Sequence, residues 1–201
     1  MVRASLIVVV MLMARVVYAQ APGEVGSQPP APGVMTKRWA IGAALGSESL
    51  TAKVDGAPHV GFGVVELAGR FRIRRDLEVA LSFVGGGAMK GELTTGGLYV
   101  DARYRFRAEQ PWNVFALAGL GVVSVARKDG SDVEKKGRGS LHLGGGVERR
   151  FGAFALAAEL KLVAIGKHAA VPPVEPPTLS YEMARYAVSG ASLTLGATYY
   201  F

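Results

Sequence analysis

Two patterns in the sequence predict an all-β fold, an eight-stranded antiparallel up-and-down transmembrane β-barrel. From Trp39 onward, apolar side chains alternate with small or polar ones, which is the period of a strand with two different faces. The connections between these runs alternate between short and long, as in an up-and-down barrel. After residue 19 no apolar run approaches the roughly 20 residues of a bilayer-spanning helix, so membrane crossing would need strands.

The alternation defines eight candidate strands. They are expected over residues 38–46, 60–73, 76–84, 98–107, 112–125, 139–151, 154–163 and 190–201. The short connections are Arg74-Arg75, residues 108–111 and Gly152-Ala153. The long connections are residues 47–59, 85–97, 126–138 and 164–189. This order places the start of the first strand, the end of the last strand and the short turns on the periplasmic side.

The first 37 residues have a different composition. Residues 1–19 have the features of a cleaved signal peptide: a basic start at Arg3, an apolar run from Ala4 to Ala14, and small residues before a cut ahead of Gln20. Residues 20–37 form a Pro-rich stretch that we expect to be a disordered linker. The barrel is therefore expected to occupy residues 38–201.

Composition excludes several classes of protein. The 201 residues carry a formal charge of +7, and loss of residues 1–19 with their two arginines leaves +5 on 182 residues. These charges are spread along the chain without a compact basic patch, which argues against nucleic-acid binding. Cysteine is absent, which excludes disulfides and a cysteine-linked lipid anchor.

Aromatic residues gather at one rim of the expected barrel, where odd strands start and even strands end. A ring of aromatic side chains at the membrane interface is typical of lipid-embedded barrels. The expected periplasmic girdle consists of Trp39, Phe71, Tyr104, Phe106, Trp112, Phe151, Phe154, Tyr199 and Phe201.

Charged residues occupy the opposite faces of the same strands, so we expect them to line the lumen. Acidic and basic members nearly balance, and an unpaired buried charge is costly, which predicts a lumen plugged by ion pairs. Tight-turn geometry places Glu78 nearly opposite Arg72. Strand 112–125 is apolar on both faces, and its facing stays open. The expected network consists of Glu66, Arg70, Arg72, Glu78, Asp101, Arg103, Arg105, Glu148, Arg150, Glu159 and Lys161.

The last strand carries the most specific motif. Its pattern Leu195-x-Ala197-x-Tyr199-x-Phe201, together with the eight-strand arrangement, resembles the small outer-membrane barrels of the OmpA and OmpX type. The resemblance implies a monomeric barrel in the outer membrane of a Gram-negative cell envelope, with a structural or surface-interaction role. It also implies that the barrel-assembly machinery recognises the C-terminal strand. No peptidoglycan-binding domain is expected after this strand.

Three alternatives remain open at this stage. Alternation alone does not say which face points inward, so a soluble lipocalin-like barrel is the competing fold. A narrow ion pore is the competing function. A lipid A-modifying enzyme is a third alternative, because Ser140, His142 and Glu159 lie on adjacent strands, although the His-x-Ser order of the deacylases is reversed.

Neither a metal site nor a cofactor is expected. His59 and His168 have no partners at ligand spacing, and the triplets Gly85–Gly87 and Gly144–Gly146 lack the context of a phosphate-binding loop. Surface binding is expected in the outer loops. Lys128, Lys135 and Lys136 are the candidate contacts to lipopolysaccharide phosphates.

Overall fold

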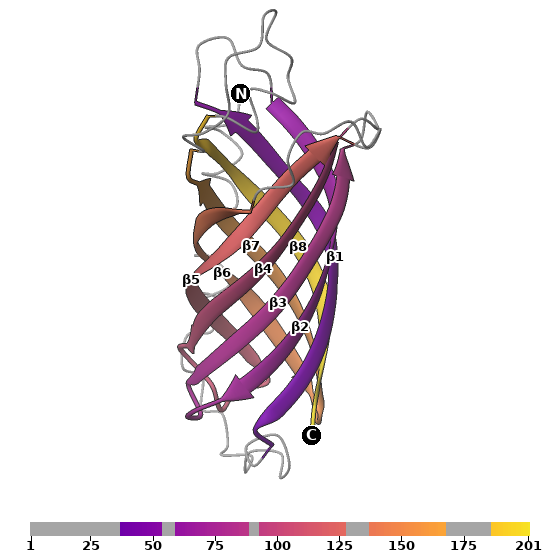
Figure 1. Ribbon diagram of the computed structural model, residues 1–201. Helices are drawn as coiled ribbons and strands as arrows, with labels where there is room; N and C mark the ends of the chain where they lie inside the picture. Colours follow the sequence, from indigo (N-terminus) through magenta and orange to yellow (C-terminus); the bar gives the residue numbers. More distant parts are fainter. Residues whose placement is uncertain (1–36, 54–58, 89–92, 128–136, 168–185) are drawn as a thin grey trace, which may run out of the picture. The chain divides into compact units, whose positions relative to one another are not determined.

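The protein is a closed barrel of eight antiparallel strands, seen in a computed structural model (Figure 1). The structure describes residues 37–53, 59–88, 93–127, 137–167 and 186–201. The strands are β1 (Trp39–Ala52), β2 (His59–Arg72), β3 (Leu77–Ala88), β4 (Leu93–Arg105), β5 (Trp112–Arg127), β6 (Arg138–Phe151), β7 (Phe154–Ile165) and β8 (Val188–Tyr200). The signal peptide and most of the linker predicted for residues 1–37 lie outside the described residues.

Closure comes from pairing of the first strand with the last. Each strand pairs with its sequence neighbours, and β1 also pairs with β8, from Ala40 opposite Tyr200 to Ala52 opposite Val188. A closed sheet leaves no edge strand with unpaired backbone groups, which is the condition for crossing a bilayer with strands. The predicted fold class and the up-and-down strand order are confirmed.

Several strands extend further toward the long-loop end than the sequence predicts. β1 continues to Ala52 and β3 to Ala88, and β4 already begins at Leu93. The residues added to β3 are mostly glycines, which sequence reasoning assigned to a loop. Gly86 pairs with Thr95, and a Cβ atom added to it would collide with the carbonyl oxygen of Gly63. The glycine therefore permits a close strand approach, and the loops after β1 and β3 are shorter than predicted.

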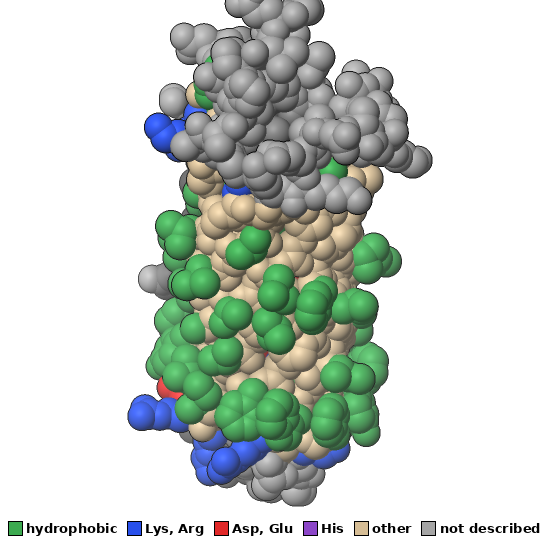
Figure 2. Space-filling view, viewed as in Figure 1, with side chains coloured by type: hydrophobic (Ala, Val, Ile, Leu, Met, Phe, Trp, Pro, Cys, Tyr) green, Lys and Arg blue, Asp and Glu red, His purple; other side chains and the backbone are tan. Residues whose placement is uncertain are grey.

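The outer wall of the barrel is apolar. Leu45, Leu141 and Leu195 are each 65% exposed, and most other large exposed side chains are aliphatic or aromatic. Figure 2 shows these hydrophobic side chains over the wall, with Lys and Arg gathered at the end where the C-terminus lies. Exposed apolar surface of this extent suits lipid rather than water. The lipocalin-like alternative, which needs the reverse facing, is therefore wrong.

The inner faces of the strands fill the lumen with two kinds of side chain. The half nearer the short turns, called here the charged half, contains most of the buried carboxylates and guanidinium groups. The half nearer the long loops contains a cluster of buried apolar side chains, called here the apolar layer. Phe115 and Leu117 of β5 are 2% exposed and face inward, which settles the facing of that strand.

In the part of the chain that the structure describes, no helix is long and apolar enough to cross a membrane.

Candidate functional site

The charged half of the lumen is organised around Arg105, at the end of β4. Its guanidinium group donates to Glu78 at 2.9 Å and to Glu148 at 3.3 Å, so one cation joins carboxylates from β3 and β6. Arg70 lies 3.9 Å from the same Glu78 oxygen. Arg105 is 1% exposed, and both carboxylates have no exposed surface. Buried charges of this kind are tolerated only when they are paired, which this cluster achieves.

Tyr200, the last residue of β8, extends the cluster across the lumen. Its hydroxyl group accepts a hydrogen bond from Arg105 at 2.9 Å. The guanidinium carbons of Arg72 and Arg150 lie 4.7 Å and 5.8 Å from the centre of its ring, within cation–π range. Arg150 also bonds Glu148 at 2.7 Å and the carbonyl oxygen of Ala108 at 2.9 Å. Five strands are thereby joined at the short-turn end.

A second ion-pair cluster lies one level further into the barrel. Lys161 of β7 bonds both Glu66 and Glu159 at 2.9 Å. Glu159 also pairs with Arg103, whose guanidinium group lies over the Phe115 ring at 5.0 Å. Ser82 donates a hydrogen bond to Glu66 at 2.8 Å. Because Lys161 and Glu66 are 95 residues apart, this cluster joins distant parts of the sequence.

Asp101 and His142 lie between the charged half and the apolar layer. The Nδ1 atom of His142 is 3.5 Å from an Asp101 carboxylate oxygen, and neither side chain has exposed surface. The His142 ring meets the Tyr99 ring edge-on, with centres 4.1 Å apart. The described residues contain no group of three or more His, Cys, Asp or Glu side chains placed to hold a metal ion.

The apolar layer lies in the lumen between these groups and the long loops. Its twelve residues are at most 7% exposed, and Val84 and Ala88 of β3 pack against it. Leu50 and Phe62 at its centre have no exposed surface. The layer consists of Leu50, Ala52, Val60, Phe62, Val64, Leu93, Tyr99, Val123, Val125, Val163, Ile165 and Val188.

All eleven side chains predicted for the lumen network face inward. Arg72 is opposite Glu78 in the β2–β3 ladder, as the turn geometry predicts. Glu78 also forms ion pairs with Arg105 and Arg70, because a carboxylate pointing into a narrow lumen reaches side chains across it.

Sequence reasoning missed several inward residues. Glu48 is 5% exposed on the part of β1 that was assigned to a loop, and Arg138 bonds the carbonyl oxygens of Tyr186 and Gly166 at the other rim. Tyr200 lies in the sequence between Tyr199 and Phe201 of the girdle, and its inward facing was not predicted. Its even number, shared with the inward Thr198, is the signal that identifies it.

The nine aromatic residues predicted for the girdle lie at the short-turn end and face outward. Eight are exposed by 46–62%, and Phe71 is half-buried against Trp39, with ring centres 4.6 Å apart. Tyr104 and Phe106 meet edge-to-face at 5.3 Å. Of the expected assembly signal, Leu195 and Tyr199 in β8 and Phe201 directly after it are exposed on the outer side.

The fold and the two-faced wall define the class: a small eight-stranded barrel of the outer-membrane type. The crystal structure of Neisserial surface protein A is similar with a TM-score of 0.60, at 17% identity over 81% of this chain and 97% of that chain. The solid-state NMR structure of the outer membrane protein AlkL in DMPC lipid bilayers is similar with a TM-score of 0.51, at 12% identity over 90% and 97%. At these identities the similarity establishes the shared fold. By sequence, neither a protein-family model nor a curated protein matches the chain.

Proposed function

We propose that this protein resides in the outer membrane as a closed, non-enzymatic barrel with a structural or surface-interaction role in the cell envelope. The observation that carries this proposal is the combination of an apolar outer wall with a filled lumen. The wall meets the requirement of the hydrocarbon region, and the aromatic girdle meets that of the interface. Because side chains fill the lumen, the outer loops are the region where a partner would bind.

The two parts of the lumen oppose ion passage in different ways. In the charged half, the carboxylates and cations are engaged with each other, so a passing ion would have to displace a buried partner. In the apolar layer, a passing ion would lose much of its water among buried apolar side chains. The pore alternative would require both barriers to open.

The geometry also favours a non-catalytic barrel. Ser140, His142 and Glu159 are all buried at 4–5% exposure on the inner face, away from lipid. Glu159 is engaged by Arg103 and Lys161, and His142 lies 3.5 Å from an Asp101 carboxylate oxygen. Ser140 Oγ makes no hydrogen bond within the described residues, so the nucleophile–base contact of a hydrolase is not formed there.

The proposed partners are outer-membrane lipids, including lipopolysaccharide, and the barrel-assembly machinery. Lys128, Lys135 and Lys136 lie outside the described residues, and their contact with lipopolysaccharide rests on sequence. Replacing all three by Glu is expected to reduce co-purifying lipopolysaccharide. Unchanged co-purification would remove this part of the proposal.

Heat-modifiability tests the proposal as a whole. The mature chain is folded into detergent or vesicles and run on a gel with and without boiling. A closed barrel resists the gel detergent until it is boiled, so the two samples are expected to migrate differently. Identical mobility, with the chain remaining soluble without detergent, would contradict membrane residence.

A further inference from the structure

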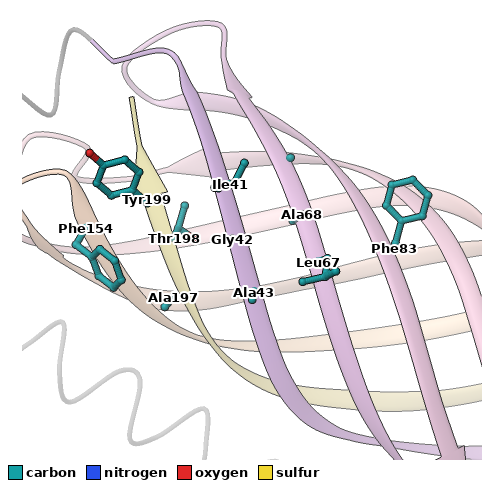
Figure 3. Close-up of a pocket in the computed structure, with 11 residues that line it drawn as sticks. Ile41, Gly42, Ala43, Leu67, Ala68, Phe83, Phe154, Ala197, Thr198 and Tyr199 are labelled. Atoms are coloured by element: carbon teal, nitrogen blue, oxygen red, sulfur yellow. The ribbon is translucent and has the colours of Figure 1, made fainter.

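A groove on the outer wall crosses the seam where the barrel closes. It has a volume of about 470 Å³ and is lined by residues of β7, β8, β1, β2 and β3. Phe154 and Tyr199 stand on one side and Phe83 on the other, with Ala43 and Ala197 between them (Figure 3). Ligand sites in proteins usually measure roughly 300–1,000 Å³. The groove is therefore large enough for part of a small molecule.

Small residues make the floor of this groove. Gly69 pairs with Ile41 on one side and with Leu81 on the other, and Ala43 pairs with Ala197 across the seam. A Cβ atom added to Gly69 would meet nothing within 4 Å, so the floor is open toward the membrane. The lining is almost wholly apolar, which suits a hydrocarbon chain.

Apolar character alone does not select an occupant in a bilayer, because lipid tails are as apolar as the groove. Selection must come from shape and from the group at the end of the chain. At the short-turn end the groove borders a basic rim. The Lys37 ammonium lies 5.5 Å from the centre of the Tyr199 ring and donates to the Tyr200 carbonyl oxygen at 3.2 Å, and Arg38 beside it is exposed.

The rim as a whole is cationic. Besides Arg150 of the lumen network, six described basic residues near the short turns are at least partly exposed, against two acidic residues. Of the six, Arg75 is paired with Glu109 at 2.8 Å. The basic residues are Lys37, Arg38, Arg74, Arg75, Arg107 and Arg149, and the acidic residues are Asp76 and Glu109. Figure 2 shows Lys and Arg at this end of the barrel. Such a rim favours a negatively charged headgroup.

We infer that this seam groove holds one acyl chain of an anionic glycerophospholipid whose headgroup phosphate lies at Lys37 and Arg38. The order along the barrel is the order of the lipid itself: chain, aromatic interface, then charge. Tyr199 connects the two parts, because it lines the groove and carries the Lys37 ammonium near its ring. The inference rests on the proposed membrane residence and adds a defined lipid site to it.

Filling the groove tests the inference directly. Gly69→Leu places a branched side chain over the open floor, whereas Gly63→Leu adds the same side chain to the same strand and face outside the groove. Neither added Cβ atom meets another atom within 4 Å. The full mature chain is reconstituted with equal parts of phosphatidylglycerol and phosphatidylethanolamine and extracted gently. Bound lipid is then counted by native mass spectrometry.

The wild type and Gly63→Leu are expected to retain one phosphatidylglycerol per chain, and Gly69→Leu to retain at least fivefold less. Lys37→Gln is expected to remove the preference for phosphatidylglycerol, while Lys53→Gln at the opposite rim keeps it. Equal retention by Gly69→Leu and Gly63→Leu would overturn the inference, as would two chains associated without lipid. A heat-shifted wild-type barrel with no retained lipid would overturn it and leave the proposed function standing. A wild-type chain without any heat shift would overturn both the inference and the proposed function.

Discussion

The charged half and the apolar layer fill the same lumen with opposite chemistry. In the charged half, Arg105 and Lys161 each hold two carboxylates from different strands. In the apolar layer, Leu50 and Phe62 pack among other buried apolar side chains. A narrow barrel can therefore close its interior either by directional pairing, which fixes register, or by non-directional packing.

The two solutions respond differently to the loss of a single side chain. Removing one member of a buried ion pair leaves the other charge without its partner in a low-dielectric interior. Removing an apolar side chain leaves a cavity and loses its transfer free energy. Substitutions in the two halves therefore distinguish the two kinds of closure.

The largest effect is expected in the charged half. Glu78→Ala removes the carboxylate that Arg105 and Arg70 share, and it should lower the free energy of unfolding by about 3–5 kcal/mol. Urea titration in vesicles, followed by the gel mobility shift, measures this loss. The control is Glu109→Ala in the exposed Arg75–Glu109 pair, which should cost at most about 1 kcal/mol. Similar losses in both variants would contradict the central role of Glu78.

In the apolar layer, Leu50→Ala is expected to cost about 2–5 kcal/mol, because the packed surroundings cannot fully collapse around the lost atoms. Leu45→Ala on the same strand is the control, since that side chain faces outward and lipid fills the space it leaves. The same titration should show a smaller loss for Leu45→Ala. A larger loss for the control would mean that the layer is loosely packed.

The boundary between the two halves is expected to be sensitive to added volume. Tyr99 lies over Gly121, and a Cβ atom there would collide with the Tyr99 ring. Gly121→Ala should therefore cost about 1–3 kcal/mol through overpacking. Gly139→Ala, where a Cβ atom meets nothing within 4 Å, should change the unfolding free energy by less than about 1 kcal/mol. Equal stabilities of the two variants would remove the packing role of Tyr99.

The smallest effect concerns pairing within the second cluster. Arg103→Met and Glu159→Leu, singly and together, form a double-mutant cycle. The loss of unfolding free energy in the double variant is expected to be about 1 kcal/mol smaller than the sum of the two single losses, because the double variant leaves neither partner unpaired. Lys161 continues to engage Glu66 and limits the gain. Strict additivity in unfolding titrations would show that this ion pair contributes no coupling free energy to stability.

Local alternation was sufficient to predict which side chains share a face of most strands, and the aromatic rim indicated which face points outward. Glu66 and Arg70 share a face by number alone, and the tight turn fixes Glu78 opposite Arg72. Alternation failed for Phe115 and Leu117, because both faces of β5 are apolar. It also failed near the long loops, where Glu48 follows Ser47 and reads as turn sequence although the ladder with β2 continues.

The partners across the lumen were beyond local reasoning. The contacts of Lys161 with Glu66 and of Arg105 with Tyr200 each join residues 95 positions apart. Which side chains meet depends on strand tilt and on the stagger accumulated around the closed sheet. Periodicity within single strands carries no information on that stagger, so the apolar layer and the two ion-pair clusters emerge only from the closed structure.

Conductance across planar lipid bilayers tests the closed lumen most directly. The folded wild-type barrel is inserted in about 1 M KCl, where the Debye length is about 3 Å and long-range charge effects are screened. We expect no steady unitary current, because the apolar layer and the ion-pair clusters both block the path. Steady single-channel steps from heat-shifted, folded barrels would contradict it and establish the pore instead.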